Sequence, residues 1–404
     1  MTTLYIDSKK VSTLYIDGKK VQLGDQVPQY LTIEPLSSAT PDADKTSITL
    51  INSASSSLTG AFEAKLNDGA WTTVSWEDVS HGIDYNLVKA CDSSKETISF
   101  GEKLQIRGLD KWNNSCSLKV TCDGGAKVSG KMAGSLTPEY AASATSNKLA
   151  SFFKGSTGLK DASRLDLGDI AIASNCYDSM FYNCTSLSQA PALPATTLAS
   201  SCYFNMFNSC TSLTQAPDLP ATALARECYY DMFRGCTSLT QAPALPATTL
   251  ADDCYNSMFN SCKSLTQAPV LPATTLASGC YNSMFYGCTS LTQAPELPAT
   301  TLASYCYNYM FNGCTSLTQA PILPATTLAI ICYSNMFRGC TSLTQAPELP
   351  ATTLANNCYN SMFYNCAKVT ELHYPASIQN DSTFTGMSGS PWFGATNATV
   401  HYDL

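Results

Sequence analysis

A 26-residue repeat constrains this 404-residue chain more than any other feature of its sequence. Two columns of cysteines mark the repeat, one from Cys176 to Cys358 and one from Cys184 to Cys366, and each column advances by 26 residues. The consensus C-Y-x-x-M-F-x-x-C-T-S-L-T-Q-A-P-x-L-P-A-T-T-L-A-x-x occurs eight times, and the last copy is cut short. Self-similarity at a period of about 20–50 residues predicts a solenoid in which each unit buries its apolar face against its neighbours.

We number positions within a repeat from its first cysteine, which is position 0. The residues Cys, Tyr, Met, Phe and Cys stand at positions 0, 1, 4, 5 and 8, whereas positions −2, −1, 2, 3, 6 and 7 vary. The i, i+4, i+8 spacing predicts a short helix or helical turn with one buried face. The second half of each unit, such as residues 213–220, contains two prolines, so it is expected to form a short extended segment that is partly polyproline-like.

The cysteines of the two columns are expected to be buried thiols that act as small hydrophobes. In a helical unit the two cysteines would lie about 12 Å apart, which is too far for a disulfide. The competing interpretation, reactive or cross-linked thiols, requires exposed side chains. The predicted core ladder comprises Cys176, Cys184, Cys202, Cys210, Cys228, Cys236, Cys254, Cys262, Cys280, Cys288, Cys306, Cys314, Cys332, Cys340, Cys358 and Cys366. The redox state of Cys91, Cys116 and Cys122, outside the columns, stays open.

The turn M-F-Y-G-C-T-S-L at residues 284–291, followed by a leucine-bearing segment, resembles the BspA-type leucine-rich repeat proteins of gut and oral bacteria. The resemblance covers about half of the chain. It implies an α/β solenoid, a right-handed superhelix displayed outside the cell, with adhesion or partner binding as its role. The second cysteine column and the A-P-x-L-P segment depart from the family pattern and put the regularity of the sheet in doubt.

The chain is expected to have five parts: an N-terminal segment at 1–27, an all-β sandwich at 28–140, a degenerate capping repeat at 141–175, eight repeats at 176–366 and a C-terminal cap at 367–404. In the C-terminal cap, Trp392 and Phe393 precede a last strand-like stretch at 398–402.

Strand candidates in the sandwich are residues 30–34, 47–51 and 97–100. N-D-G at 67–69 and D-G-G at 123–125 predict hairpins, and an immunoglobulin-like topology is expected.

The N-terminal segment is a tandem decapeptide, T-L-Y-I-D-S-K-K-V at 3–11 and T-L-Y-I-D-G-K-K-V at 13–21. Each copy is compatible with a strand and a turn. One hypothesis is an attachment strand for a larger assembly, and the other is a surface hairpin or a duplication introduced in cloning.

Charge and motifs exclude several functions. The formal net charge of −8 disfavours nucleic-acid binding, because phosphate neutralisation needs a basic surface. No stretch reaches the roughly 18 apolar residues of a membrane helix, and the N-terminus lacks a secretory signal pattern. No catalytic motif is present, His81, His373 and His401 lie in unrelated local contexts, and no CxxC pair occurs. We therefore expect neither an enzyme nor a metal or cofactor site.

Candidate binding residues lie at the varying positions. Asn, Ser and Tyr fill 32 of these 48 sites, a composition typical of antibody binding loops, although exposed turns also tolerate Asn and Ser. Tyr and Arg suit stacking on sugar rings or contacts with proteins. The candidates are Tyr182, Phe204, Tyr230, Arg234, Tyr286, Tyr305, Tyr309, Arg338 and Tyr364. A second candidate surface is the varying column at position 16, which runs from Ala192 to Glu348.

We expect a non-enzymatic adhesion protein at the cell surface, or extracellular, that recognises a host glycan or protein through the varied face of the solenoid. Two alternatives stay open: a receptor-binding component of a phage tail or injection machine, located on a virion, and a structural spacer. The sequence leaves the oligomeric state open.

Overall fold

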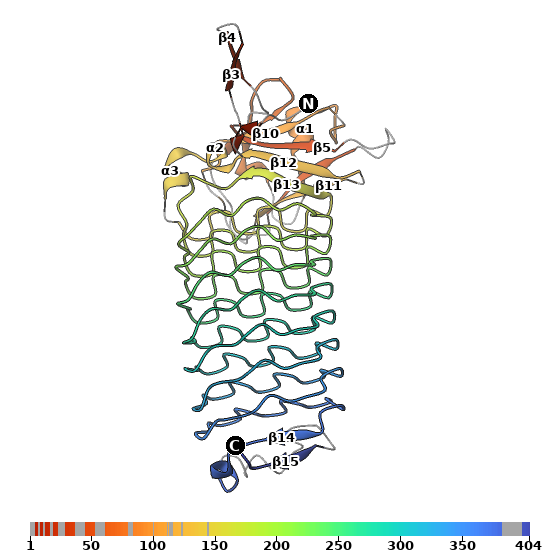
Figure 1. Ribbon diagram of the computed structural model, residues 1–404. Coiled ribbons are helices and arrows are strands. Elements are labelled where there is room, and N and C mark those ends of the chain that lie inside the picture. Colours follow the sequence, from red (N-terminus) through yellow and green to blue (C-terminus); the bar gives the residue numbers. More distant parts are fainter. Residues whose placement is uncertain are drawn as a thin grey trace.

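The computed structural model describes residues 29–36, 45–52, 61–79, 84–99, 101–110, 112, 116–122, 124–143, 145–381 and 398–404, together with the backbone of four short strands before residue 23. The repeats form stacked coils, with a β-sheet domain at the N-terminal end and a small cap at the C-terminal end (Figure 1). His81, Phe100, Asp123, Trp392 and Phe393 lie outside the described residues.

Each N-terminal decapeptide forms an antiparallel strand pair. Strand β1 (Tyr5–Ile6) pairs with β2 (Lys9–Lys10), and β3 (Thr13–Ile16) pairs with β4 (Lys19–Gln22).

The domain that follows contains two sheets. The six-stranded sheet has the order β13-β12-β5-β10-β7-β8 and comprises β13 (Leu159–Asp166), β12 (Ala126–Lys131), β5 (Leu31–Pro35), β10 (Leu104–Arg107), β7 (Ala61–Leu66) and β8 (Thr72–Ser75). The three-stranded sheet has the order β11-β6-β9 and comprises β11 (Cys116–Thr121), β6 (Ser47–Asn52) and β9 (Tyr85–Asn86). Buried residues alternate with less buried ones along β6 and β11, and Ile48, Leu50 and Leu118 are among the buried core residues of the domain. The short helices are η2 (Trp76–Asp78), α1 (Leu87–Cys91), α2 (Met132–Ser135) and α3 (Pro138–Ala142).

The sheets agree with some strand predictions and correct others. The hairpin around residues 67–69 is present, since β7 and β8 are antiparallel neighbours. Strands β11 and β12, which flank the D-G-G sequence, do not form the predicted hairpin, because β11 lies in one sheet and β12 in the other. Within 97–100, Ile98 makes only an isolated bridge to Thr46. The order also differs from that of an immunoglobulin domain, because the first strand, β5, lies between β10 and β12.

The cysteine-bearing half of each repeat is a run of β-turns, so the predicted short helix is wrong. Backbone N–H groups at even positions bond three residues back, as from Met180 to Tyr177 (3.1 Å). N–H groups at odd positions bond to the next repeat, as from Tyr177 to Cys202 (2.8 Å). Every fourth residue, at positions −1, 3 and 7, has a positive φ. The buried 0, 4, 8 face therefore follows a four-residue turn period, with the left-handed residue third in each turn, as in a type II turn.

The proline-containing half is extended and pairs sparsely. Neighbouring repeats meet there through isolated parallel bridges between position-13 glutamines, such as Gln215 with Gln241, and between some position-21 residues, such as Thr275 with Thr301. Among the described residues no continuous strand forms in the eight repeats. The irregularity expected from the A-P-x-L-P segment is thus present, since proline has no N–H for a sheet ladder.

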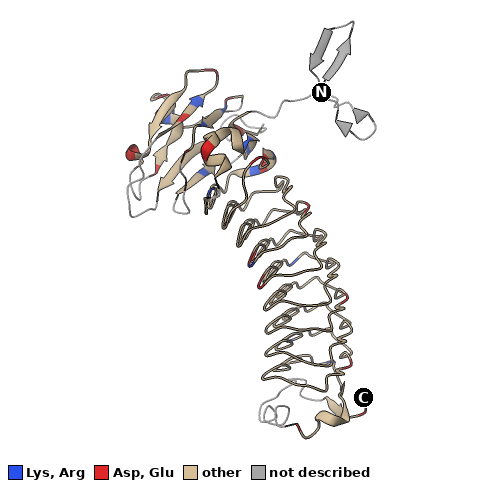
Figure 2. Cartoon of the chain, turned by 90° about the vertical axis from the view of Figure 1, so that its left-hand side faces the viewer, with Lys and Arg blue, Asp and Glu red and all other residues tan. Residues whose placement is uncertain are grey.

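The core of the stack consists of side-chain columns that run through all the repeats. The position-1 tyrosines stack with ring centroids 5.5–6.0 Å apart, from Tyr177 to Tyr359. The position-5 phenylalanines stack at 5.5–5.8 Å, from Phe181 to Phe363. These spacings exceed the roughly 4.8 Å between paired strands. The stack of repeats as a whole follows a curve (Figure 2).

All sixteen column cysteines are buried and free. Each position-8 thiol donates to the carbonyl oxygen of the phenylalanine one repeat earlier, as from Cys288 Sγ to Phe259 O at 3.1 Å, and the same bond recurs from Cys184 to Cys366. In the described part of the chain no position-0 cysteine makes this bond. The second column is therefore polar as well as space-filling, which the small-hydrophobe interpretation does not include.

The stack and the sheet domain are joined through the N-terminal capping repeat. There Lys148 and Ser156 stand where later repeats have their two cysteines. Both side chains are fully buried. Lys148 Nζ donates to the carbonyls of Ala141, Ser143 and Ala171, and Ser156 Oγ donates to Leu118 O of β11 at 3.0 Å. Strand β13 of this repeat also pairs in parallel with β12.

The C-terminal cap contains a two-stranded parallel sheet. Strand β14 (Glu371–His373) pairs with β15 (Thr399–His401), and a turn of 3₁₀ helix, η3 (Ala376–Ile378), follows β14. Tyr374, directly after β14, is fully buried against Tyr359 of the last repeat.

Candidate functional site

The candidate binding residues all lie on the turn face, which we define as positions −2 to 7 of the repeats. Arg234, Tyr286, Tyr305 and Arg338 are exposed, and the other five are half-buried. Six of the nine form neighbouring pairs: the rings of Phe204 and Tyr230 stack at 4.9 Å, those of Tyr286 and Tyr309 lie 6.4 Å apart, and Arg338 Cζ lies 4.6 Å from the Tyr364 ring. Tyr182 lies under Lys154 of the capping repeat, 5.2 Å from its Nζ.

Backbone geometry explains most of the polar residues on the turn face. Asn, Ser, Asp and Gly occupy 20 of the 24 positions with positive φ, and these residues tolerate left-handed backbone at the least cost. Several also bond to one another, as Asn208 Nδ2 does to Asn205 Oδ1 at 2.7 Å. Asn208, Asn256 and Asn335 are buried. The high Asn and Ser content is therefore mainly a requirement of the turns.

Four residues break this rule: Glu227, Tyr305, Tyr309 and Ile331 have φ between 56° and 61°. Glu227 accepts a hydrogen bond from Ser201 and pairs with Arg226, so local contacts account for it. Left-handed backbone costs an L-residue such as tyrosine or isoleucine roughly 1–2 kcal/mol. Nothing in the fold requires these three bulky side chains, because equivalent positions in other repeats carry Asn, Ser, Asp or Gly and, in one case, Glu.

The three bulky exceptions lie in adjacent repeats beside two exposed apolar residues. Tyr286 is 39% exposed and Ile330 is 46% exposed, while Tyr305 is 42% exposed. The Tyr305 N–H bonds to Ile330 O at 3.0 Å, and Tyr309 neighbours Tyr286. We call the group formed by Tyr286, Tyr305, Tyr309, Ile330 and Ile331 the aromatic patch. Ile330 and Ile331 were not among the predicted site residues, although their departure from Asn, Ser and Gly was a readable signal.

The second candidate surface, which we call the proline face, comprises positions 14–18. Among the described residues, it carries the two most exposed large apolar side chains, Val270 at 78% and Ile322 at 82%. Ile322 and Glu296 line a hollow of about 380 Å³ between prolines of adjacent repeats. Val270 and Ile322 stand two repeats apart, and Glu296 occupies the equivalent position between them.

Charge is concentrated away from both surfaces. The eight repeats contain twelve of the 54 charged residues, and most coloured positions in Figure 2 lie in the N-terminal domain. Burial raises the pKa of Asp231 on the turn face, and Arg234, 3.4 Å away, partly offsets this effect. Either surface therefore offers a partner shape and apolar contact more than charge. Among the described residues no helix is long and apolar enough to cross a membrane.

Two of the three histidines do not have unrelated contexts. The parallel pairing of β14 and β15 places His373 directly opposite His401, and their rings stack with centroids 4.7 Å apart. Glu371 and Asp403 lie next to His373. The expectation that these histidines are unrelated is thus wrong, because the sequence did not show that residues 28 positions apart would pair.

Comparison with known families gives one match. Residues 166–292 and 255–388 match the family described as "BspA type Leucine rich repeat region", in six copies, and together span more than half of the chain. No curated protein matches the chain. The chain belongs to the BspA-type leucine-rich repeat family.

Proposed function

We propose that the protein is a non-enzymatic binding protein displayed outside the cell, and that it recognises a host protein through the aromatic patch. Surface display and adhesion are common in the BspA-type family. The observation that carries the proposal is the presence of Tyr305, Tyr309 and Ile331 at left-handed positions. Strained backbone persists where function requires it, so residues that cost stability without improving the fold indicate a binding role.

The composition of the patch favours a protein partner over a glycan. Sugar rings stack on flat aromatic faces, whereas Ile330 and Ile331 add branched apolar surface that polar sugars do not need. Tyrosine anchors surrounded by aliphatic side chains are typical of protein interfaces. The small number of charges on the repeats predicts that binding depends only weakly on salt.

The free cysteines of the repeats are compatible with an oxidising extracellular environment, because their thiols are buried. Free cysteines are unusual in oxidising surroundings, where thiols tend to form disulfides. Here burial raises the pKa of Cys228 and Cys236 to about 12, which keeps them protonated and unreactive.

The proposal can be tested on arrays of host surface proteins and host glycans. One variant combines Tyr305→Asn with Ile330→Ser. The introduced Asn and Ser already occupy the equivalent positions in other repeats. Because these changes remove strain or exposed apolar surface, they should leave the fold intact. We expect the wild-type chain to bind a protein on the array and the variant to bind it at least about tenfold more weakly, the loss of roughly 1.4 kcal/mol.

The matched control changes the proline face, with Val270→Ala and Ile322→Ala. Alanine already occupies position 16 at Ala192 and Ala244. This control should bind like the wild type. Binding that the control abolishes and the patch variant keeps would move the site to the proline face, and binding of glycans alone would refute the protein-partner proposal. An array without any ligand would favour the structural spacer.

A further inference from the structure

The C-terminal cap gathers four side chains that can coordinate a metal ion or support such coordination. Side chains two residues apart in a strand point to the same face of a sheet. Glu371 and His373 are so related on β14, as are His401 of β15 and Asp403 beyond its end. Since His373 pairs with His401, all four residues share one face of the small sheet.

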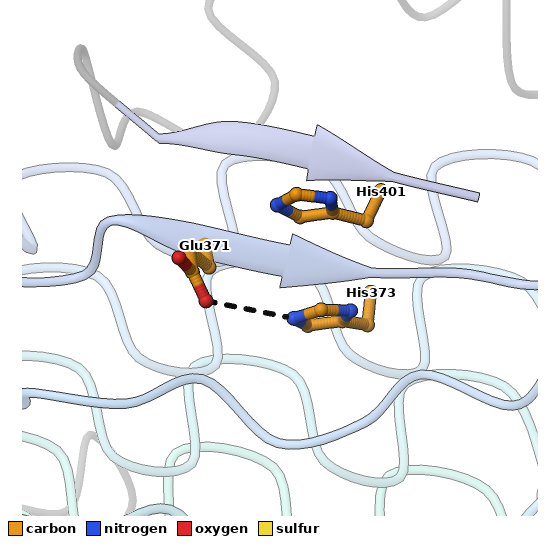
Figure 3. Close-up of side chains that lie close together, drawn as sticks. All are labelled: Glu371, His373 and His401. Atoms are coloured by element: carbon orange, nitrogen blue, oxygen red, sulfur yellow. Dashed lines mark ion pairs between the residues drawn. The ribbon is translucent and has the colours of Figure 1, made fainter. Parts of the chain in front are cut away.

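The ligand atoms of Glu371, His373 and His401 converge. One such atom from each residue lies within 4.8 Å of the other two. His373 Nε2 is 3.8 Å from Glu371 Oε2, and the imidazole rings are nearly parallel, at 12°. Figure 3 shows the two rings one above the other, with an edge of each turned toward the Glu371 carboxylate.

Asp403 holds His373 in the orientation that metal coordination requires. Its two carboxylate oxygens lie 2.9 and 3.1 Å from His373 Nδ1. With the proton held on Nδ1, the Nε2 lone pair is left for a ligand on the Glu371 side. His401 Nε2 is buried and has no hydrogen-bond partner among the described residues.

We propose that Glu371, His373 and His401 bind one divalent transition-metal ion of the zinc class, with Asp403 as the positioning residue for His373. Two imidazole nitrogens and one carboxylate are ligands that Zn²⁺ accepts, with a water molecule in the fourth position. Calcium and magnesium prefer oxygen ligands only, so they fit this donor set poorly. With metal–ligand bonds of about 2.0–2.1 Å, the ligand atoms of a tetrahedral site lie about 3.3 Å from one another. Side-chain rotations that move these atoms by about 1 Å would therefore complete the site.

The bound ion would cross-link the last strand to the repeat stack. Strand β15 pairs with β14 over only three residues, and a long stretch of sequence separates them. Closing that stretch has an entropic cost, which a metal bridge between Glu371, His373 and His401 would offset. The bound ion would therefore fix the end of the stack.

A calorimetric titration of the metal-free full-length chain with Zn²⁺ tests the site. We expect one ion per chain, and we expect Zn²⁺ to slow amide exchange of β14 and β15. Replacing Zn²⁺ with Co²⁺ separates this site from the cysteines, because nitrogen and oxygen ligands produce no thiolate-to-cobalt charge-transfer absorbance. His401→Ala should abolish binding, whereas Asp403→Asn should keep one ion per chain with about 10–100-fold weaker affinity.

His81→Ala, the change of the remaining histidine, is the matched control and should bind like the wild type. Circular dichroism should show that all three variants retain the wild-type fold. Three results would overturn the proposal: no saturable binding, a thiolate spectrum with Co²⁺, or His401→Ala binding as tightly as the control.

Discussion

Alkaline pH should unfold the repeat stack, because it carries two buried thiols in each unit. In the third repeat, burial raises the pKa of both Cys228 and Cys236 from 9.0 to about 12. A raised pKa means that the folded chain keeps a proton that the unfolded chain releases. The stability contributed by each thiol is therefore fully present below pH 9 and is lost as the pH rises toward 12.

The size of the effect follows from proton linkage. Above pH 9, each thiol should lower the free energy of unfolding by about 1.4 kcal/mol per pH unit, so the two thiols of one repeat should cost about 3 kcal/mol at pH 10 relative to pH 8. Burial raises the pKa of six column thiols to about 12, and together these six should cost about 8 kcal/mol at pH 10, which is comparable to the usual 5–15 kcal/mol stability of a domain. Burial also raises the pKa of the position-1 tyrosines, which adds to the loss at higher pH.

Guanidinium unfolding curves at pH 7, 8, 9 and 10, followed by near-ultraviolet circular dichroism, would measure this loss. Thiolate absorbance during an alkaline titration should appear together with unfolding and not before it. A chain with Cys228→Ala and Cys236→Ala should have a shallower pH dependence above pH 9, by about 2.7 kcal/mol per pH unit. Thiols that ionise near pH 9 while the circular dichroism stays native, or a stability that is flat from pH 8 to 10, would refute the assignment of buried thiols.

Three further predictions concern single positions in the stack. Cys288→Ala should destabilise the protein by about 1 kcal/mol more than Cys280→Ala, measured by chemical unfolding, because only the first loses a thiol-to-carbonyl bond; equal losses would contradict this. Tyr281→Phe should leave the free energy of unfolding unchanged or raise it, because the Tyr281 hydroxyl is buried without a described partner. Tyr177→Phe should lower the free energy of unfolding by about 1 kcal/mol, because the Tyr177 hydroxyl loses its hydrogen bond to a carbonyl. Thermal melts of the two variants distinguish these outcomes. Tyr305→Asn should raise the free energy of unfolding by about 1 kcal/mol through relief of left-handed strain, and a lower stability would show that the tyrosine serves the fold.

The repeat period, the buried positions and the family could be read from the sequence, but the local backbone could not. Buried residues at positions 0, 4 and 8 fit both a helix of 3.6 residues per turn and a run of four-residue turns, because the two periods differ little over nine residues. A distinguishing signal was present at positions −1, 3 and 7, which are filled by residues such as Ser179, Asn183 and Gly235. Helices disfavour Gly, Asn and Ser in their interiors, and left-handed turn positions favour them.

The candidate sites differ in how far the sequence could reveal them. The tyrosines of the aromatic patch could be named because they interrupt a regular repeat, although the strain that makes them informative depends on φ angles. The histidine pair could not be named, because the register of two short parallel strands is set by how the last coil closes. Only that register brings His373 and His401 together.

Near-identical repeats also create a risk of error during folding. Any repeat can pack against any other through almost the same hydrogen bonds. A misfolded chain in which one repeat is skipped in the stack would therefore lose little free energy locally. Lys148 and Ser156 mark the unit that fits the sheet domain, because Lys148 Nζ donates to Ala141 O and Ser156 Oγ donates to Leu118 O of β11. Lys148 and Ser156 therefore fix which unit of the stack contacts the sheet domain. The number of repeats that follow this unit can change without altering those contacts.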